Sequence, residues 1–372
     1  MSKLTRNLSM AVAACLMAAA ASAQATTTLY WAGGSSGAWD NTTQNWSTSN
    51  GGSANSAWVN GDAAQFGSVT TASINANVSA AQLNINADTT LTGSGAYTLT
   101  VANNNPAAGG AGQTLAVNGA NVDFSTGYRG GAPNLELDSG TITIGGAGSN
   151  FDPSSKNWAL TVNGGTLDAS GATYGLRLGS ASFNGSGEDA TGVQNAGTVT
   201  IGGQGLQIGT GPGSTAATSS TAVSYTLNGG TLGLTHLNFG AVANSSATFN
   251  LAGGVVTVNT NTIAFDTGSS VGTEAFNFVT GNGTPGTLVL KNSSNTSGDW
   301  NFTSLTGITN SSFLVNGVAA TSSDLSFASD PTLTGYTDIS VATTPEPSTL
   351  AMFVLGTVGL GMLGLRRNAT RR

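Results

Sequence analysis

Two pairs of carboxylates are the residues best suited to carry chemistry in this sequence. Glu136 and Asp138 stand two positions apart in an alternating apolar run, so they share one face of an expected strand. Two carboxylates on one face are the arrangement that a β-helical glycosidase or lyase uses for general acid and base steps. Glu188 and Asp189 are adjacent in a Gly/Ser-rich stretch and are expected to be solvated.

The surroundings of these acids disfavour catalysis. Enzymes that act on uronates also need basic groups, and residues 24–344 hold only four basic side chains. The single histidine, His236, lies between Leu234 and Leu237 and is expected in a turn or on the surface of a repeat rather than on a metal. The Gly-x-Ser-x-Gly run at 33–37 lacks the strand-then-helix context of a nucleophile elbow. We therefore expect no enzyme activity, metal or cofactor, and keep a glycan-active β-helix enzyme as the alternative.

The composition favours a β protein. Glycine accounts for 54 of the 372 residues, whereas the chain has only 10 basic (Lys and Arg) and 17 acidic (Asp and Glu) residues. Regularly placed Leu, Ile, Val and Phe argue against collagen and disorder. Residues 24–344 carry four basic and 16 acidic side chains, a net charge of −12. This charge disfavours nucleic acid as a partner, and it repels anionic polysaccharide unless a cation bridges the two.

Short alternating apolar runs, separated by Gly/Asn/Ser turns, recur from about residue 71 onward. A glycine opens the second strand of each unit, at Gly140, Gly165, Gly197, Gly230, Gly254 and Gly286. Successive glycines lie 25, 32, 33, 24 and 32 residues apart. Three short strands within this length predict one coil of a parallel β-solenoid.

Stacked coils would align one apolar residue from each unit in an inner file: Leu167, Val199, Leu232 and Val256. Outward Thr and Asn would form ladders from coil to coil. We predict an all-β parallel β-helix (β-solenoid) over residues 71–342, with a β-sandwich or jelly roll as the alternative. The Asn-Gly-Gly-Thr-Leu units resemble the autotransporter-associated β-strand repeats of bacterial surface proteins, over about residues 130–290.

An aromatic N-terminal segment, residues 24–70, precedes these repeats. Four of the six tryptophans lie in it: Trp31, Trp39, Trp46 and Trp58. Its W-x-G-G, N-W and G-D-x-A-x-F-G pattern resembles the opening segment of exported proteins that carry such repeats. The structural interpretation is an aromatic cap that covers the open end of the first coil. The functional alternative is glycan binding, with the tryptophans as a sugar-stacking platform.

The N-terminus carries an export signal. Lys3 and Arg6 precede a small-residue apolar run over 10–21, and Ala21 and Ala23 form the small-x-small site that signal peptidase requires. Residues 1–23 are therefore predicted to be a signal peptide that is removed. A lipoprotein signal at Cys15 is the alternative.

The C-terminus carries a second membrane signal. Residues 348–365 are free of charge and just long enough to cross a membrane as a helix. The basic residues Arg366 and Arg367 follow directly, so the positive-inside rule places this tail in the cytoplasm and the body outside. Directly before the helix stands the triplet Pro345, Glu346 and Pro347.

Pro-Glu-Pro, a short apolar helix and a terminal arginine cluster, in this order, resemble the PEP-CTERM sorting signal of Gram-negative bacteria that make exopolysaccharide. The resemblance implies that residues 343–372 are a sorting signal with a transmembrane helix, which an exosortase processes near Pro345–Pro347. It implies a transient inner-membrane anchor, followed by release to the cell surface or the medium. A permanent single-span anchor with a proline-stiffened linker is the alternative.

Together these features predict an exported structural or adhesive protein of the cell surface or extracellular matrix, associated with exopolysaccharide or biofilm. The expected partners are signal peptidase and exosortase during processing, exopolysaccharide afterwards, and the membrane through the C-terminal helix before processing. No nucleic acid is expected to bind.

Overall fold

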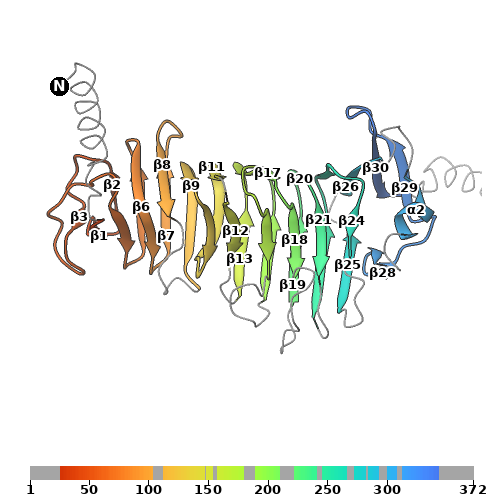
Figure 1. Ribbon diagram of the computed structural model, residues 1–372, viewed down its shortest axis with the longest axis horizontal. Coiled ribbons are helices and arrows are strands. Elements are labelled where there is room, and N and C mark those ends of the chain that lie inside the picture. The colour runs from red at the N-terminus through yellow and green to blue at the C-terminus, as the bar shows by residue number, and fades with distance from the viewer. Residues whose placement is uncertain are drawn as a thin grey trace, which may run out of the picture.

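The computed structural model describes residues 26–103, 112–146, 148–153, 157–179, 189–209, 222–240, 245–265, 272–281, 284–292, 300–307 and 312–342. Short strands stack side by side along the long axis of the molecule, from β1 and β3 at one end to β29 and β30 at the other (Figure 1). The strands form three ladders, of which the first two belong to one continuous sheet. This arrangement confirms the predicted parallel β-solenoid.

Ladder I runs the whole length of the stack through parallel pairs. It consists of β2 (Ser36–Trp39), β5 (Thr70–Ile74), β7 (Thr89–Gly93), the first halves of β9 (Thr114–Phe124) and β11 (Asn134–Ile144), β13 (Trp158–Val162), β16 (Ala190–Gln194), β19 (Ala222–Leu227), β22 (Ser246–Leu251), β25 (Thr273–Phe278) and β27 (Phe313–Val315).

Ladder II follows the same axis, also through parallel pairs. It consists of β1 (Thr28–Trp31), β4 (Ala63–Phe66), β6 (Val78–Ile85), β8 (Thr98–Asn103), the second halves of β9 and β11, β14 (Thr166–Ala169), β17 (Thr198–Ile201), β20 (Thr231–Leu234), β23 (Val255–Val258) and β26 (Thr287–Lys291).

Ladder III is shorter, because its first strand begins at Gly127 and its last described strand ends at Ala264. The coils between these points contain strands of three ladders, and the described coils before and after them contain strands of ladders I and II. Ladder III consists of β10 (Gly127–Gly130), β12 (Asn150–Pro153), β15 (Leu176–Leu178), β18 (Leu206–Gly209), β21 (Leu237–Gly240) and β24 (Ile263–Ala264). The units predicted to contain three strands, such as 193–208 and 225–239, contain all three.

The predicted register is confirmed residue by residue. Ladder II pairs, coil by coil, the residues that directly follow the six predicted glycines: Thr141, Thr166, Thr198, Thr231, Val255 and Thr287. The same pairing aligns Leu167 with Val199, Leu232 and Val256, and each of these side chains is at most 1 % exposed. The sequence repeat is therefore the structural repeat.

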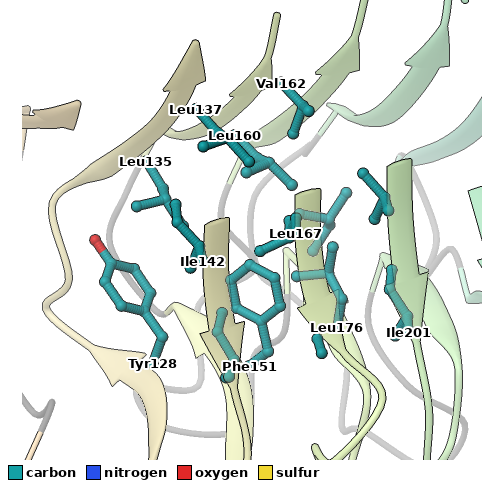
Figure 2. Packing of buried hydrophobic residues seen from close by; sticks show 14 of the residues in the cluster. Tyr128, Leu135, Leu137, Ile142, Phe151, Leu160, Val162, Leu167, Leu176 and Ile201 are labelled. Carbon is teal, nitrogen blue, oxygen red and sulfur yellow. The ribbon is translucent and has the colours of Figure 1, made fainter. Parts of the chain in front are cut away.

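Inward side chains of all three ladders meet in one continuous apolar core. Figure 2 shows Leu135, Ile142 and Phe151, from ladders I, II and III, pointing into the same interior. All three are buried, because successive residues of a strand point to opposite faces and the apolar ones take the inner positions. Burying one apolar edge of each coil against the next stabilises coils that could not fold alone.

Glycine is required where ladder I turns into ladder II. Gly197 has a φ of 76°, in the left-handed region that favours glycine. A Cβ atom on Gly197 would lie 2.5 Å from the carbonyl oxygen of Gly165 in the preceding coil, so the turns stack glycine on glycine. Gly230 and Gly254 repeat this arrangement.

Aromatic rings stack along the interior of ladder I. Tyr225 and Phe249 have ring centroids 5.5 Å apart, and Phe249 and Phe276 continue the stack at 5.0 Å. Gly192 precedes them in the file, and a Cβ there would collide with the Tyr225 ring. The buried Tyr225 hydroxyl donates a hydrogen bond to Gln194 Oε1 at 3.0 Å, which satisfies its polar atom.

Antiparallel strands close the stack at both ends. At the N-terminal end, β3 (Trp46–Ser47) pairs with the outer edge of β1. At the C-terminal end, β28 (Val318–Ala319) pairs with β27, and β30 (Tyr336–Val341) joins β26 to β29 (Leu325–Ser329). A short helix, α2 (Phe302–Gly307), lies in the connection between β26 and β27. Antiparallel closure limits the exposed sheet edge on which further coils could add.

The predicted transmembrane helix belongs to residues 343–372, which lie outside the described residues. Within the described part of the chain, no helix has the length and apolar character needed to cross a membrane.

Candidate functional site

The four N-terminal tryptophans form one buried cluster around Phe66. Trp39 and Trp46 are fully buried, Trp58 is 2 % exposed and Trp31 is 8 % exposed. The rings of Trp39 and Trp46 meet edge to face with centroids 5.0 Å apart, and Trp46 and Trp58 lie 4.7 Å apart. Because their faces are covered by one another, the geometry supports the capping interpretation of this segment. Glycan binding by these four side chains stays a prediction.

The small residues of the W-x-G-G and N-W pattern fit around this cluster. Asn45 Nδ2 donates a hydrogen bond to the carbonyl oxygen of Ala38 on β2 at 2.8 Å. A Cβ on Gly33 would lie 2.8 Å from Trp31 Cζ2, and one on Gly37 would lie 2.9 Å from Asn45 Nδ2. The pattern therefore builds the first coil, with Asn45 satisfying a carbonyl of its edge strand.

The candidate catalytic pair, Glu136 and Asp138, lies at the end of a ladder of asparagine side chains. The Nδ2 group of Asn163, one coil further on, donates to Asp138 Oδ1 at 2.8 Å and to Glu136 Oε1 at 3.2 Å. Asn195 donates to Asn163 at 2.8 Å, and Asn228 donates to Asn195 at the same distance. The asparagine ladder thus runs in one direction, with the two carboxylates as its final acceptors.

This position gives the two carboxylates a structural role. Every amide in the asparagine ladder donates toward the N-terminal end, and a carboxylate is the acceptor that makes the strongest hydrogen bond there. The predicted placement of both acids on one face is confirmed by their shared contact with Asn163. The sequence predicted ladders of outward Asn side chains from coil to coil. It did not predict that this ladder ends on the two carboxylates.

The other chemistry-bearing residues of the sequence do not gather. Asp189 Oδ1 accepts a hydrogen bond from the Ala222 amide at 2.6 Å, and its neighbour Glu188 lies outside the described residues. The Nδ1 atom of His236 is buried without a hydrogen-bond partner. No group of three or more His, Cys, Asp or Glu side chains suited to a metal ion occurs in the part of the chain that the structure describes.

A charged file on the outer side of ladder III was not predicted. Arg129 pairs in register with Asp152, and Arg177 follows on the next coil with its Nη1 atom 3.7 Å from Asp152 Oδ2. Arg177 also donates to Gln204 Oε1 at 3.0 Å and lies over the Tyr174 ring. These contacts hold Arg177 in place above a fully buried carboxylate. No sequence signal joins these residues, because their spacing depends on the lengths of the intervening turns.

A second unpredicted pair lies in the C-terminal hairpin. Burial, the charge of Asp330 and a hydrogen bond with Asp330 raise the pKa of Asp338 to about 6. Burial alone would raise the pKa of Asp330 as well, but hydrogen bonds from Leu333 and Thr332 lower it. The pair therefore holds one proton more firmly than an isolated aspartate does.

The predicted processing residues lie outside the described part of the chain: Ala21, Ala23, Pro345, Glu346, Pro347, Arg366 and Arg367. What the structure does describe is the boundary of the body. Its last strand, β30, ends at Val341, and the Ala342 amide donates to the carbonyl oxygen of Asp324 at 2.8 Å. The last described strand thus ends a few residues before the Pro-Glu-Pro triplet.

Residues 343–368 match a family model described as the PEP-CTERM protein-sorting motif. The match confirms the sorting signal and, with it, an exosortase substrate that is exported and sorted to the cell surface. No curated protein and no solved structure matches the chain. The likeness of the coils to autotransporter-associated repeats stays a prediction, although the repeat itself is confirmed by the strand register.

Proposed function

We propose that this protein is a non-catalytic structural or adhesive component of the cell surface or extracellular matrix, associated with exopolysaccharide or biofilm. The observation that carries the proposal is the position of the sorting motif, residues 343–368, directly behind a solenoid whose last described strand ends at Val341. Processing within the motif would leave every described strand in the exported body.

The organisation of the outer surface supports a structural role. Its polar side chains bond to their counterparts on neighbouring coils, as in the asparagine ladder and in the pair Asn277 and Asn250, whose amides are joined at 2.9 Å. Glu136 and Asp138 belong to this pattern. Repeated surfaces of this kind suit contact with extended polymers, because each coil offers a similar contact.

The proposal extends to the organism and to the membrane. We infer a Gram-negative producer and a transient inner-membrane anchor, and the sorting motif supports this inference. Exopolysaccharide is proposed as a partner because this sorting signal is typical of bacteria that make exopolysaccharide.

The test uses the mature exported protein and the exopolysaccharide of its producer. The proposal predicts that the protein is retained on the polysaccharide and that no new reducing or unsaturated ends appear. Cleavage of the polysaccharide would overturn the non-catalytic role and favour the glycan-active enzyme. Absence of retention would overturn the association with exopolysaccharide.

A further inference from the structure

Among the residues that the structure describes, two aromatic side chains are exposed: Tyr97 at 41 % and Tyr174 at 38 %. Tyr97 lies in the turn between β7 and β8, before ladder III begins. Tyr174 lies in the turn between β14 and β15, two residues before the ladder III strand of its coil. An exposed aromatic ring offers a flat apolar face to a ligand, so the surroundings of each ring decide whether it belongs to a binding site.

The Tyr174 ring is held in place by a chain of contacts. The guanidinium carbon of Arg177 lies over this ring, 5.1 Å from its centroid. Arg177 Nη1 lies 3.7 Å from Asp152 Oδ2 on the preceding coil, and Arg177 Nη2 donates to Gln204 Oε1 on the following coil at 3.0 Å. The ring and the guanidinium group are therefore fixed before a ligand arrives, which lowers the entropy cost of binding.

Two glutamines extend this arrangement onto the next coil. Gln204 corresponds to Tyr174, because each lies two residues before the ladder III strand of its coil, β18 and β15. Gln207 pairs in register with Arg177. Neighbouring strands lie about 4.8 Å apart, so the four side chains cover an area comparable to one or two sugar rings. We call these four residues the Tyr174 array: Tyr174, Arg177, Gln204 and Gln207.

The solenoid does not need the Tyr174 array in order to fold. On later coils the register position of Arg177 is occupied by Asn238 and Ala264, and the position of Tyr174 by Thr235. A buried ion pair also contributes little stability compared with uncharged residues at the same place. Coils of the same ladder thus fold without an aromatic or charged side chain here, which points to a role in binding.

The chemistry of the Tyr174 array matches a sugar. The apolar face of a sugar ring packs on an aromatic ring, and sugar hydroxyls exchange hydrogen bonds with amide and guanidinium groups. Asp152 compensates the charge of Arg177, and residues 24–344 carry a net charge of −12. This field repels polyanions, including nucleic acid, but it does not repel an uncharged glycan.

We propose that the Tyr174 array binds an uncharged polysaccharide, with one sugar ring stacked on Tyr174 and its hydroxyl groups bonded to Arg177 and Gln207. This inference rests on the proposed association with exopolysaccharide and adds the site and the glycan class. Asn238 borders the array on the third coil, where its Nδ2 atom donates to the carbonyl oxygen of Gln204 at 3.1 Å. A glycan chain that runs along the solenoid axis reaches Asn238 next.

The test measures the affinity of the mature exported protein and its variants for the producer's exopolysaccharide. Tyr174→Ala removes the ring, and Tyr97→Ala is the matched control, because it removes a similarly exposed tyrosine outside the array. Tyr174→Phe keeps the ring. Gln207→Ala removes one amide group and leaves the contacts of Arg177 in place. Equal melting temperatures show that the fold is kept.

Tyr174→Ala should lower the affinity about tenfold or more and Gln207→Ala about threefold or more, whereas Tyr97→Ala and Tyr174→Phe should stay within about twofold. If Tyr174→Ala does not fold, the loss in Gln207→Ala decides. Equal affinity of all four variants with a wild type that is retained would overturn the inference, and the proposed function would stand without this site. If the wild type is not retained, the proposed function itself fails.

Salt and Arg129 test the glycan class. Arg129 is exposed and lies in the same file of ladder III, two coils before Arg177. Binding of an uncharged glycan should be the same at low and high salt, and Arg129→Gln should change the affinity by less than about twofold. An affinity that falls steeply with salt and with Arg129→Gln would identify the ligand as an acidic polysaccharide and overturn the proposed class.

Discussion

Thr231 and Leu232 are neighbours in β20 that lie on opposite sides of the solenoid wall. Thr231 is exposed, and its Oγ1 atom lies 3.2 Å from that of Thr198 on the preceding coil. Leu232 is 1 % exposed and stands in the inner file between Val199 and Val256. A single residue step thus separates the interior of the stack from its outer surface.

Leu232→Asp is expected to unfold or aggregate the body, since an unpaired carboxylate in the apolar file costs several kcal/mol. Thr231→Asp should lower the free energy of unfolding by less than about 1 kcal/mol, because its side chain points to water. Chemical denaturation of both variants measures the difference. Equal tolerance at the two positions would contradict the assigned register.

Gly230→Ala is expected to lower the free energy of unfolding by about 2–4 kcal/mol. Gly230 has a φ of 80°, and an added Cβ would collide with the Gly197 carbonyl oxygen of the preceding coil. Gly233→Ala is the matched control, because its Cβ would meet only the Val199 carbonyl oxygen, at 4.0 Å. Similar losses at both glycines would show that the turn geometry is not what requires Gly230.

Asp338→Asn should stabilise the protein at pH 7.5 and have little effect at pH 4.5. The folded pKa of Asp338, about 6, is above its ordinary value, so the folded state binds more protons than the unfolded state between these values. The free energy of unfolding of the wild type therefore falls as pH rises through this window. Partial solvent exposure limits the gain at pH 7.5 to roughly 1 kcal/mol.

Denaturant titrations at the two pH values test this prediction. Asp324→Asn is the control in the same end of the molecule. Hydrogen bonds from Thr321 lower the pKa of Asp324, so its loss should not stabilise the protein at pH 7.5. If Asp338→Asn left the pH dependence of the free energy of unfolding unchanged, the pair of Asp330 and Asp338 would not be the group that holds the proton.

Glu136→Gln and Asp138→Asn separate the structural from the catalytic interpretation of these acids. Both variants should keep full retention on the exopolysaccharide and lose at most about 1–2 kcal/mol of stability, because Asn163 keeps an uncharged acceptor. Retention assays and melting curves provide the comparison. A cleavage activity that is present in the wild type and absent from both folded variants would establish them as general acid and base.

The solenoid could be predicted in register because its turns demand glycine. Where Gly140, Gly165 and Gly197 recur, the backbone conformation and the close approach of the next coil leave no other residue, and the sequence shows this directly. The inner apolar file follows from the same alignment. Features that repeat once per coil, such as the turn glycines and the inner apolar residues, can therefore be predicted from the sequence.

Features that depend on the distance between coils were not predictable. The asparagine ladder ends on Glu136 and Asp138 only because one particular coil comes before Asn163. The file of Arg129, Asp152 and Arg177 requires the registers of β10, β12 and β15. The antiparallel closure at the C-terminal end has no repeat to reveal it, and the pair of Asp330 and Asp338 forms within it.

The central claim, that the folded body is exported and sorted through its C-terminal signal, is tested most directly by the intact mass of the protein recovered outside the cell. We predict a species that lacks residues 1–23 and ends near residues 345–347 when exosortase is active, and that keeps its C-terminal segment when exosortase is deleted. An exported species that retains Arg372 in cells with active exosortase would contradict the claim.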